Sequence, residues 1–405
     1  QSGKDAPMKP ARVVSVVLFA AIAATSVRAD HEEGYFAPPG SFTVELSLES
    51  SPYLRLPLDR NAVTSLVVSG DYAIGGTTAS NGQSPFLFAV SLSRKKLERI
   101  LDLEEVVPGQ RAVVSGFGRG RDGILFAGTM SQPGAAAGGH LIRVALGERG
   151  LAANDLGTPV PGEGIFALAA DPERDVVYGL SHPSGKFWSV EIASRRTKVW
   201  GETVPDERML FTYYQFALKP DDYLSRRLIV DASGRVYGSR PVNKLFRFDP
   251  ETQRIEVMPR ELPGHSDRRV LGRADAWAVA PDGRIYGGNA GEGQLFRLDP
   301  ATGAVVNLGK PTLLPRMKGI AFGRNGKLYG IAGGAPGYSR VFQYDPGGGF
   351  TDLGIARFEM VGEQMPRGIF WRGFQLVSLA ASEDGRYFVM GDDEALSQLM
   401  VFEIQ

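Results

Sequence analysis

Four residues in the middle of the chain could together carry acid–base chemistry: His140, His182, Tyr223 and Arg240. One reaction that suits this set is β-elimination on a uronic-acid polysaccharide. In that reaction Arg or a protonated His would pair with the sugar carboxylate, and His or Tyr would remove the neighbouring proton. Tyr would then return a proton to the leaving glycosidic oxygen. The sequence therefore predicts an acid–base site that contains these residues.

Each residue also has a structural alternative. His140 could satisfy a backbone carbonyl at the start of a strand, and Tyr223 could be a packing residue at the rim. Arg240 could form a surface ion pair of little energetic value. His182, which precedes a proline in a loop, is the better functional candidate of the two histidines.

Further polar residues are candidates for ligand contacts. The residues predicted to bind substrate are Lys186, Tyr214, Asn243, Asn289 and Arg340. The acidic run Asp392, Asp393 and Glu394 is a weak candidate for a divalent-cation site, because carboxylate oxygens suit calcium. No local ligand motif supports that site, and a solvated loop is the favoured alternative. The sequence requires no cofactor and leaves a structural calcium or zinc ion open.

A repeat that occurs seven times after about residue 40 must position these residues. Its clearest copies are Ser233–Gly238, Asp282–Gly287 and Asn325–Gly330, each followed by a segment that ends in Asp-Pro. The marker glycines are Gly76, Gly128, Gly179, Gly238, Gly287, Gly330 and Gly391, spaced by about 52 residues on average. Each copy reads as strand A, an Asp-Gly or Asn-Gly hairpin turn, strand B, a variable loop, strand C, a turn and strand D.

Four antiparallel strands in each of seven repeats predict an all-β fold, a seven-bladed β-propeller, with eight blades as the alternative. The last copy, 374–404, has room for only three strands. We expect a strand within 42–48 or 53–58 to supply the fourth and to close the ring without exposed edges.

The longer B–C and D–A connections should gather on one face of the ring, at the mouth of the central channel. Tyr223 is expected to open strand A of the fourth blade, and Arg240 is expected to end strand B of that blade. Hairpin pairing of those two strands would bring both side chains together on this face. It is the candidate working face.

The repeat region resembles the secreted seven-bladed β-propeller proteins of bacteria, which include polysaccharide lyases of the ulvan-lyase type. The resemblance rests on the segments 178–188, 223–231 and 235–240. It implies a His, a Tyr and an Arg on the propeller face, often with a second His. The matching positions would be His182 or His140, Tyr223 and Arg240.

Composition narrows the function classes. Lys plus Arg and Asp plus Glu each number 45, and this zero balance argues against a nucleic-acid partner. The absence of cysteine excludes disulfides, zinc–thiolate sites and a cysteine nucleophile. A basic start at Met8, an apolar run over 13–27 and small residues before a cleavage point near Ala29 predict a signal peptide over 8–29.

The predicted organisation is therefore a cloning remnant at 1–7, the signal peptide, and one propeller domain over 30–405 in the periplasm or outside the cell. The favoured function is that of an exported polysaccharide lyase with a carbohydrate ligand. A non-catalytic propeller that binds a ligand or a protein, and a metal-dependent lactonase-like hydrolase, remain the alternatives. The oligomeric state stays open.

Overall fold

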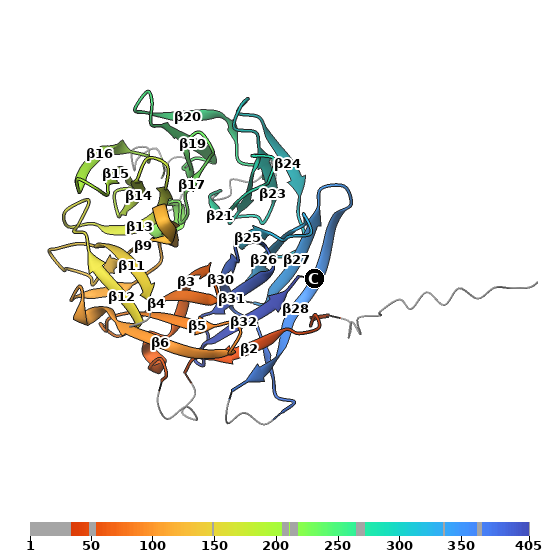
Figure 1. Cartoon of the computed structure of the whole chain (residues 1–405). Helices are drawn as coiled ribbons and strands as arrows, with labels where there is room; N and C mark the ends of the chain where they lie inside the picture. Colours follow the sequence, from red (N-terminus) through yellow and green to blue (C-terminus); the bar gives the residue numbers. More distant parts are fainter. Residues whose placement is uncertain are drawn as a thin grey trace, which may run out of the picture. The chain divides into compact units, whose positions relative to one another are not determined.

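A computed structural model describes residues 34–47, 54–147, 150–204, 210, 218–264, 272–334, 337–362 and 367–404. These residues are mostly β-strands, grouped as four-stranded antiparallel sheets around a ring (Figure 1). The all-β propeller predicted from the repeat is confirmed. The predicted signal peptide and Tyr214 lie outside the described residues. Within those residues, no helix has the length and apolar character needed to cross a membrane.

The first three blades follow the order of the chain. The first contains β3 (Ala62–Ser69), β4 (Tyr72–Thr78), β5 (Phe86–Ser91) and β6 (Lys96–Asp102). The second contains β8 (Phe117–Arg119), β9 (Leu125–Gly128), β11 (Leu141–Gly147) and β12 (Gly150–Asp155). The third contains β13 (Gly164–Asp171), β14 (Val176–His182), β15 (Lys186–Glu191) and β16 (Arg196–Glu202). The short strands β7 (Gln110–Ala112) and β10 (Met130–Ser131) extend the first sheet.

Three further blades continue the pattern. The fourth contains β17 (Ile229–Val230), β18 (Val236–Arg240), β19 (Lys244–Asp249) and β20 (Arg254–Glu261). The fifth contains β21 (Ala274–Val279), β22 (Ile285–Asn289), β23 (Leu295–Leu298) and β24 (Val305–Gly309). The sixth contains β25 (Met317–Phe322), β26 (Leu328–Gly333), β27 (Ser339–Asp345) and β28 (Gly349–Val361). Short helical segments are η1 (Leu58–Arg60), η2 (Leu103–Glu105), η3 (Arg121–Gly123) and α2 (Pro220–Tyr223).

The last blade combines both ends of the described chain. It contains β30 (Leu376–Ala381), β31 (Tyr387–Asp392) and β32 (Gln398–Glu403), and β2 (Phe42–Glu45) pairs antiparallel with β32. The strand expected within 42–48 therefore occupies the outer position. On its other side β2 pairs parallel with β28, where Phe42 lies opposite Glu359. Two short strands, β1 (Tyr35–Phe36) and β29 (Phe370–Arg372), also pair with β28.

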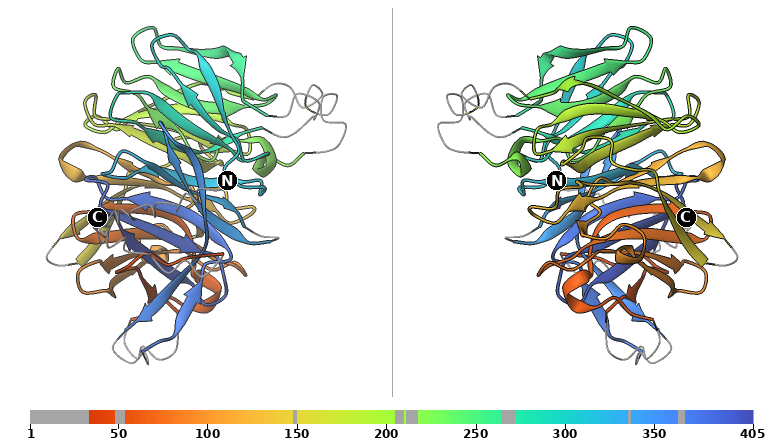
Figure 2. Two further views of the ribbon diagram at one scale, coloured as in Figure 1. Left: turned by 90° about the vertical axis from the view of Figure 1, so that its right-hand side faces the viewer. Right: turned by 90° about the vertical axis from the view of Figure 1, so that its left-hand side faces the viewer.

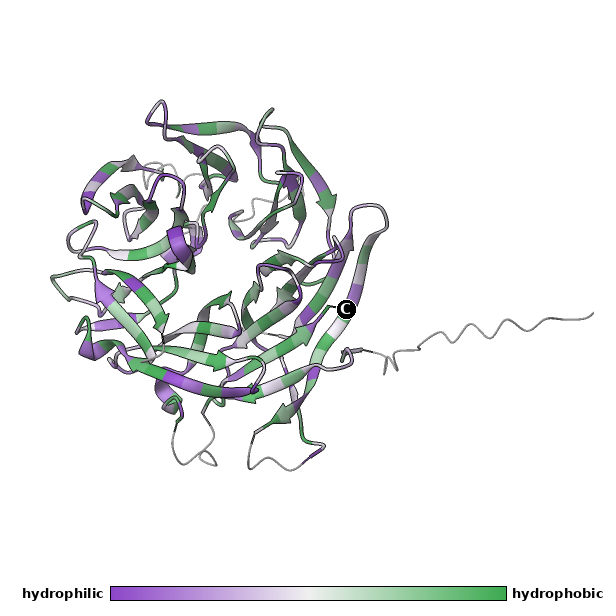
Figure 3. Ribbon diagram, viewed as in Figure 1, coloured by the Kyte–Doolittle hydropathy of each residue, from purple (hydrophilic) through white to green (hydrophobic). Residues whose placement is uncertain are grey.

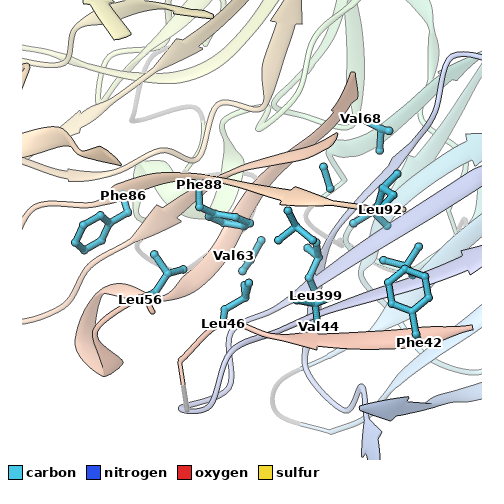
Figure 4. Close-up of a cluster of buried hydrophobic side chains, with 14 residues drawn as sticks. Phe42, Val44, Leu46, Leu56, Val63, Val68, Phe86, Phe88, Leu92 and Leu399 are labelled. Atoms are coloured by element: carbon cyan, nitrogen blue, oxygen red, sulfur yellow. The ribbon is translucent and has the colours of Figure 1, made fainter. Parts of the chain in front are cut away.

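A shared hydrophobic core holds this junction together. Val44 and Leu46 from the N-terminal segment pack with Val63 and Phe88 of the first blade and with Leu399 of the last (Figure 4). All five side chains are almost completely buried. Each such side chain contributes about 1.5–3 kcal/mol when it is removed from water. The junction is therefore a packed core as well as a backbone pairing.

Strand-B glycines pack directly on strand-C rings in five blades. Each pair lies at directly opposed positions of the two strands: Gly75 with Phe88, Gly179 with Trp188, Gly238 with Phe246, Gly287 with Phe296, and Gly330 with Phe342. A Cβ on any of these glycines would come within 2.1–2.5 Å of a ring carbon. The repeat uses glycine here because a larger residue has no room above the ring.

Carboxylates and amides at the turns stabilise the hairpins. The side-chain oxygens of Asp282 and Asn325 accept the backbone N–H two residues further on, at 3.0 and 3.1 Å. Asp249 and Asp299 do the same in turns between the two outer strands, at 2.8 and 2.9 Å. These contacts explain the recurrent acidic or amide residue at the turns. Figure 3 shows apolar strands around the ring and hydrophilic residues at many of the turns between them.

Candidate functional site

The inner strands of all seven blades line one central cavity of about 160 Å³. Each blade contributes an apolar side chain: Leu66, Phe117, Leu168, Ile229, Trp277, Ile320 and Leu379. Three charged residues, Arg227, Asp275 and Lys318, also line it. The channel is therefore lined by an apolar side chain from every blade together with charged residues from three blades.

His182 lies at the end of β14 and contacts an inserted segment of the next blade. Its Nε2 is 3.0 Å from the Oδ1 of Asp221 in α2. The His182 ring also packs on Phe166, with the ring centroids 5.2 Å apart. The interaction with His182 is the main cause that lowers the pKa of Asp221, against the effect of burial. The imidazole and the carboxylate are thus within ion-pair distance, but Nε2 has no hydrogen bond of good geometry among the described residues.

This contact places the two kinds of long connection on one face. His182 ends strand B of the third blade, whereas α2 precedes strand A of the fourth. Figure 2 shows α2, in green, at one face of the ring. The predicted grouping of B–C and D–A connections is therefore seen directly at this pair of blades.

Arg226 shares the Phe166 ring with His182. Its guanidinium carbon lies 5.4 Å from the Phe166 centroid, and its Nε is buried without a hydrogen-bond partner in the described part of the chain. Burial is the main cause that lowers the pKa of Arg226, and the nearby charge of Arg273 lowers it further. Asp275 and Asp221 act in the opposite direction. An incompletely paired cation and the imidazole therefore both lie near the Phe166 ring.

Further cations surround this point. Arg227 donates hydrogen bonds to the carbonyls of Val114 and Thr64, and burial lowers its pKa to about 10. Burial is also the main cause that lowers the pKa of Lys318. Asp275 accepts a hydrogen bond from Arg273 Nε at 2.7 Å. Electrostatic interactions here link five cationic side chains with four carboxylates: Arg226, Arg227, Arg273, Arg316 and Lys318 with Asp221, Asp222, Asp275 and Asp393. The channel mouth therefore carries charges of both signs.

Tyr223 does not open strand A of the fourth blade, contrary to the expectation. It ends α2, and the inner strand β17 begins six residues later at Ile229. The side chain is 9% exposed and packs in a cluster with Met130 and Phe166. An inserted helical turn and linker separate Tyr223 from the strand, so hairpin pairing does not join it to Arg240. Tyr223 therefore occupies a packed position, as the structural alternative for this residue expected.

Arg240 ends β18 as expected, but it lines a different pocket. This pocket, of about 540 Å³, lies between blades 3 and 4 and includes Trp200, Thr203 and Glu256, with neither His182 nor Tyr223. The Arg240 Nε donates to the Pro241 carbonyl at 3.1 Å. His182 and Tyr223 both contact the cluster around Phe166. The structure thus brings two of the four predicted catalytic side chains, His182 and Tyr223, to the same cluster.

His140 lies toward the outside of its blade. Its Nδ1 is 3.0 Å from both carboxylate oxygens of Asp155, which ends the outer strand β12. Its backbone N–H donates to the Thr129 hydroxyl at 2.8 Å. The imidazole is therefore paired with a carboxylate at the sheet's outer edge, and His182 is the histidine that lies with the charged residues of the mouth.

The predicted substrate-binding residues have structural partners. Lys186 Nζ donates to Glu163 at 2.9 Å, and this hydrogen bond is the main cause that raises the Lys186 pKa. Asn243 accepts from the Gly272 N–H at 2.8 Å, and Asn289 donates to the Pro263 carbonyl at 2.8 Å. Arg340 pairs with Asp352 at 2.9 Å. Each of these four side chains is thus already paired within the protein.

The acidic run is divided between core and surface. Asp392 is fully buried and accepts hydrogen bonds from Trp371 Nε1 at 2.9 Å and from the Gln398 N–H at 3.0 Å. Burial raises the pKa of Asp392 well above its usual value. In the described ranges, no group of three or more His, Asp or Glu side chains is arranged to hold a metal ion. The cation-site hypothesis for Asp392, Asp393 and Glu394 has no support there.

Sequence reasoning missed the cations of the mouth. Arg226 and Arg227 are consecutive and come just before the inner strand β17. Asp275 and Lys318 are each the second residue of an otherwise apolar inner strand. The signal that could have found them is a charged residue at the start of strand A, where apolar residues normally face the channel.

The sequence matches no protein-family model and no curated protein. Solved structures do show likeness. A streptogramin B lyase is 13% identical with a TM-score of 0.58, covering 90% of this chain and 98% of that one. A virginiamycin B lyase from Staphylococcus aureus is 11% identical with a TM-score of 0.57, covering 90% and 100%. The WD40 repeats of RRP9 are 12% identical with a TM-score of 0.55, covering 85% and 95%.

These identities show the fold alone. The protein is a β-propeller, and the fold is shared by lyases and by repeat scaffolds. The likenesses do not show the resemblance to ulvan-lyase-type propellers.

Proposed function

We propose that this propeller binds the carboxylate of an acidic polysaccharide at the channel mouth and cleaves the chain by β-elimination. The observation that carries the proposal is the Phe166 ring, which His182 and Arg226 both contact. An imidazole and a cation on one aromatic ring are the groups that this reaction needs beside the reacting carbon.

Each residue has its own role in the proposed reaction. Arg226 binds the sugar carboxylate and makes the adjacent C–H more acidic, and His182 accepts that proton. Asp221, 3.0 Å from the imidazole Nε2, positions the ring. The carbon–oxygen bond then breaks as the carbon–carbon double bond forms, and the imidazolium returns its proton to the leaving oxygen. In these steps the proton removed from the sugar carbon is the one returned to the leaving oxygen, so the reaction needs no second acid.

A second candidate is a propeller that binds the same ligand without cleaving it. The burial of Tyr223, the separate pocket of Arg240 and the outer position of His140 favour it, because three of the four predicted catalytic groups are not presented to the mouth. The likeness to WD40 repeats is compatible with such a binding function.

The deciding experiment combines an activity assay with a binding assay. The protein is incubated with a panel of uronic-acid polysaccharides, and the ultraviolet absorbance of the unsaturated product is followed. We expect His182→Asn to lower the rate about 10²–10⁴-fold, as loss of a general base does. Arg226→Gln should weaken both binding and turnover. Arg284→Gln, which removes an exposed cation paired with Asp282 at a turn, is the matched control.

The outcomes separate the candidates. Product formation that depends on His182 and Arg226 supports the lyase. Binding without product across the panel supports the non-catalytic candidate. Loss of activity in Arg240→Gln but not in Arg226→Gln would move the site to the other pocket. Neither binding nor product would refute both proposals.

We also propose export of the protein, on the basic and apolar segment that ends near Ala29. Amino-terminal sequencing of the protein recovered from periplasm and medium tests it. Recovery of the uncleaved chain from the cytoplasm would contradict it.

A further inference from the structure

A second pocket lies beside β28 and β29, at the junction of the last two blades. It has a volume of about 400 Å³ and is lined by Arg357, Phe370, Trp371, Arg372, Phe374 and Glu394. This volume is within the range of about 300–1,000 Å³ that is usual for small-molecule sites. None of these residues belongs to the channel mouth described above.

Two arginines stand directly opposite each other in this pocket. Arg357 on β28 and Arg372 on β29 are cross-strand partners, so they project from the same face of the hairpin. Both guanidinium groups lie over the ring of Tyr35, at 5.5 and 5.3 Å from its centroid. Glu359, opposite Phe370, lies on the same face of the hairpin. A bound carboxylate would accept hydrogen bonds from both guanidinium groups.

The pocket also contains an apolar platform. Phe370 is 45% exposed, although most large apolar side chains of the described chain are covered. The Arg357 guanidinium lies 4.5 Å from the Phe370 centroid. On the other face of β29, Trp371 is held by its hydrogen bond to Asp392. An exposed ring next to cations suits a ligand with both an apolar face and a negative charge, as an acidic sugar has.

Glu394 supplies an acceptor. The Glu394 carboxyl group accepts backbone hydrogen bonds from Phe374 and Gln375, whereas its Oε1 is buried and has no hydrogen-bond partner among the described residues. A buried oxygen of this kind is costly unless a ligand or water donates to it. A sugar hydroxyl provides such a donor. The charge of Asp393, the preceding residue, acts on Lys318 at the channel mouth. Consecutive residues of one loop thus belong to the pocket and to the mouth.

We infer that this pocket is a second subsite, which binds one uronate unit of the polysaccharide. The carboxylate lies between Arg357 and Arg372, the sugar face packs on Phe370, and a hydroxyl donates to Glu394. The inference rests on the proposed function for the identity of the ligand, and it extends that function along the chain of the substrate.

The test measures binding in a variant that cannot cleave the polysaccharide. In a His182→Asn background, calorimetry records the affinity for a short uronate oligosaccharide and for a neutral oligosaccharide of equal length. We expect Arg372→Gln and Phe370→Ala each to weaken uronate binding about tenfold, the loss of one charge-assisted or stacking contact. The control Arg284→Gln should bind as the background does, and circular dichroism should show the same fold for all variants.

The possible results are distinct from those of the activity assay. Unchanged affinity in Arg372→Gln and Phe370→Ala, with loss only in Arg226→Gln, would overturn the second subsite even if cleavage occurs. Equal affinity for the neutral oligosaccharide would overturn the role of the two arginines. Binding that depends on Arg372, in a protein that yields no unsaturated product, would support the subsite and refute the lyase.

Discussion

Replacing Gly287 by alanine tests why the repeat requires glycine on strand B. An ideal Cβ at Gly287 would lie 2.2 Å from Phe296 Cζ and 2.7 and 2.8 Å from two further ring carbons. Ordinary carbon–carbon contacts are about 3.5–4.0 Å long. Phe296 is completely buried, so its ring cannot move into solvent. The substitution must shift the ring by more than about 1 Å.

The size of the effect follows from two opposed terms. Overpacking a core costs about 1–3 kcal/mol. Alanine in place of glycine restricts the unfolded chain, which stabilises the fold by about 0.4–1 kcal/mol. Gly347→Ala is the matched control, because its Cβ would meet nothing closer than 3.6 Å and neither glycine has a positive φ. The difference between the two variants isolates the clash, at about 1–3 kcal/mol.

Urea unfolding of both variants provides the measurement, with tryptophan fluorescence as the signal. Trp277 reports on the site because its ring packs edge-on against Phe296, with the centroids 5.5 Å apart. The double variant Gly287→Ala/Phe296→Leu should recover part of the loss, since the smaller side chain makes room. Equal unfolding free energies for Gly287→Ala and Gly347→Ala would show that the close approach does not explain the repeated glycine.

Three further predictions concern charge. Burial raises the pKa of Asp392 in the folded state, so its contribution to stability is largest below the ordinary carboxyl range and is lost as the pH rises. Asp392→Asn should therefore stabilise the protein more at pH 7 than at pH 4, and a gain independent of pH in urea unfolding would contradict this. Burial would raise the pKa of Glu163, but hydrogen bonds from Ser181, Ser184 and Lys186 outweigh it and lower the pKa, so its contribution is present above the ordinary carboxyl range and is lost on acidification. Glu163→Gln should cost stability at pH 7 and little near pH 3, as thermal melts at both pH values would show. Affinity for uronate polymers should fall as salt rises, because cations of the mouth are screened, and a salt-independent Kd would argue against an ionic contact.

The repeat predicted most of the fold. Periodic glycines, hairpin turns and a three-stranded last copy led to a propeller closed near residues 42–48, and β2 occupies that position. The packing role of the glycines could not be predicted from the sequence alone. Gly287 and its equivalents lie within strands, opposite a ring, and that close contact depends on the register of two strands.

The site was predicted less well, for a physical reason. Tyr223 was assigned to a strand because the repeat was extended through an insertion. Pro220, Asp221 and Asp222 favour the start of a helix there, since proline suits the first turn and acidic residues suit its positive end. The partners of Arg227 are Val114 and Thr64, which are 113 and 163 positions away in the chain. Contacts between distant blades follow from ring geometry, which local sequence patterns do not contain.

The pairing of β2 with β32 has a consequence for biosynthesis. Ribosomes make β2 early, yet its antiparallel partner is the last strand of the described chain. Nearby, Asn61 donates to the Ala395 carbonyl, 334 positions further on. The nascent chain must therefore keep an apolar, unpaired strand from aggregating while six blades emerge, and such long-range pairing slows folding.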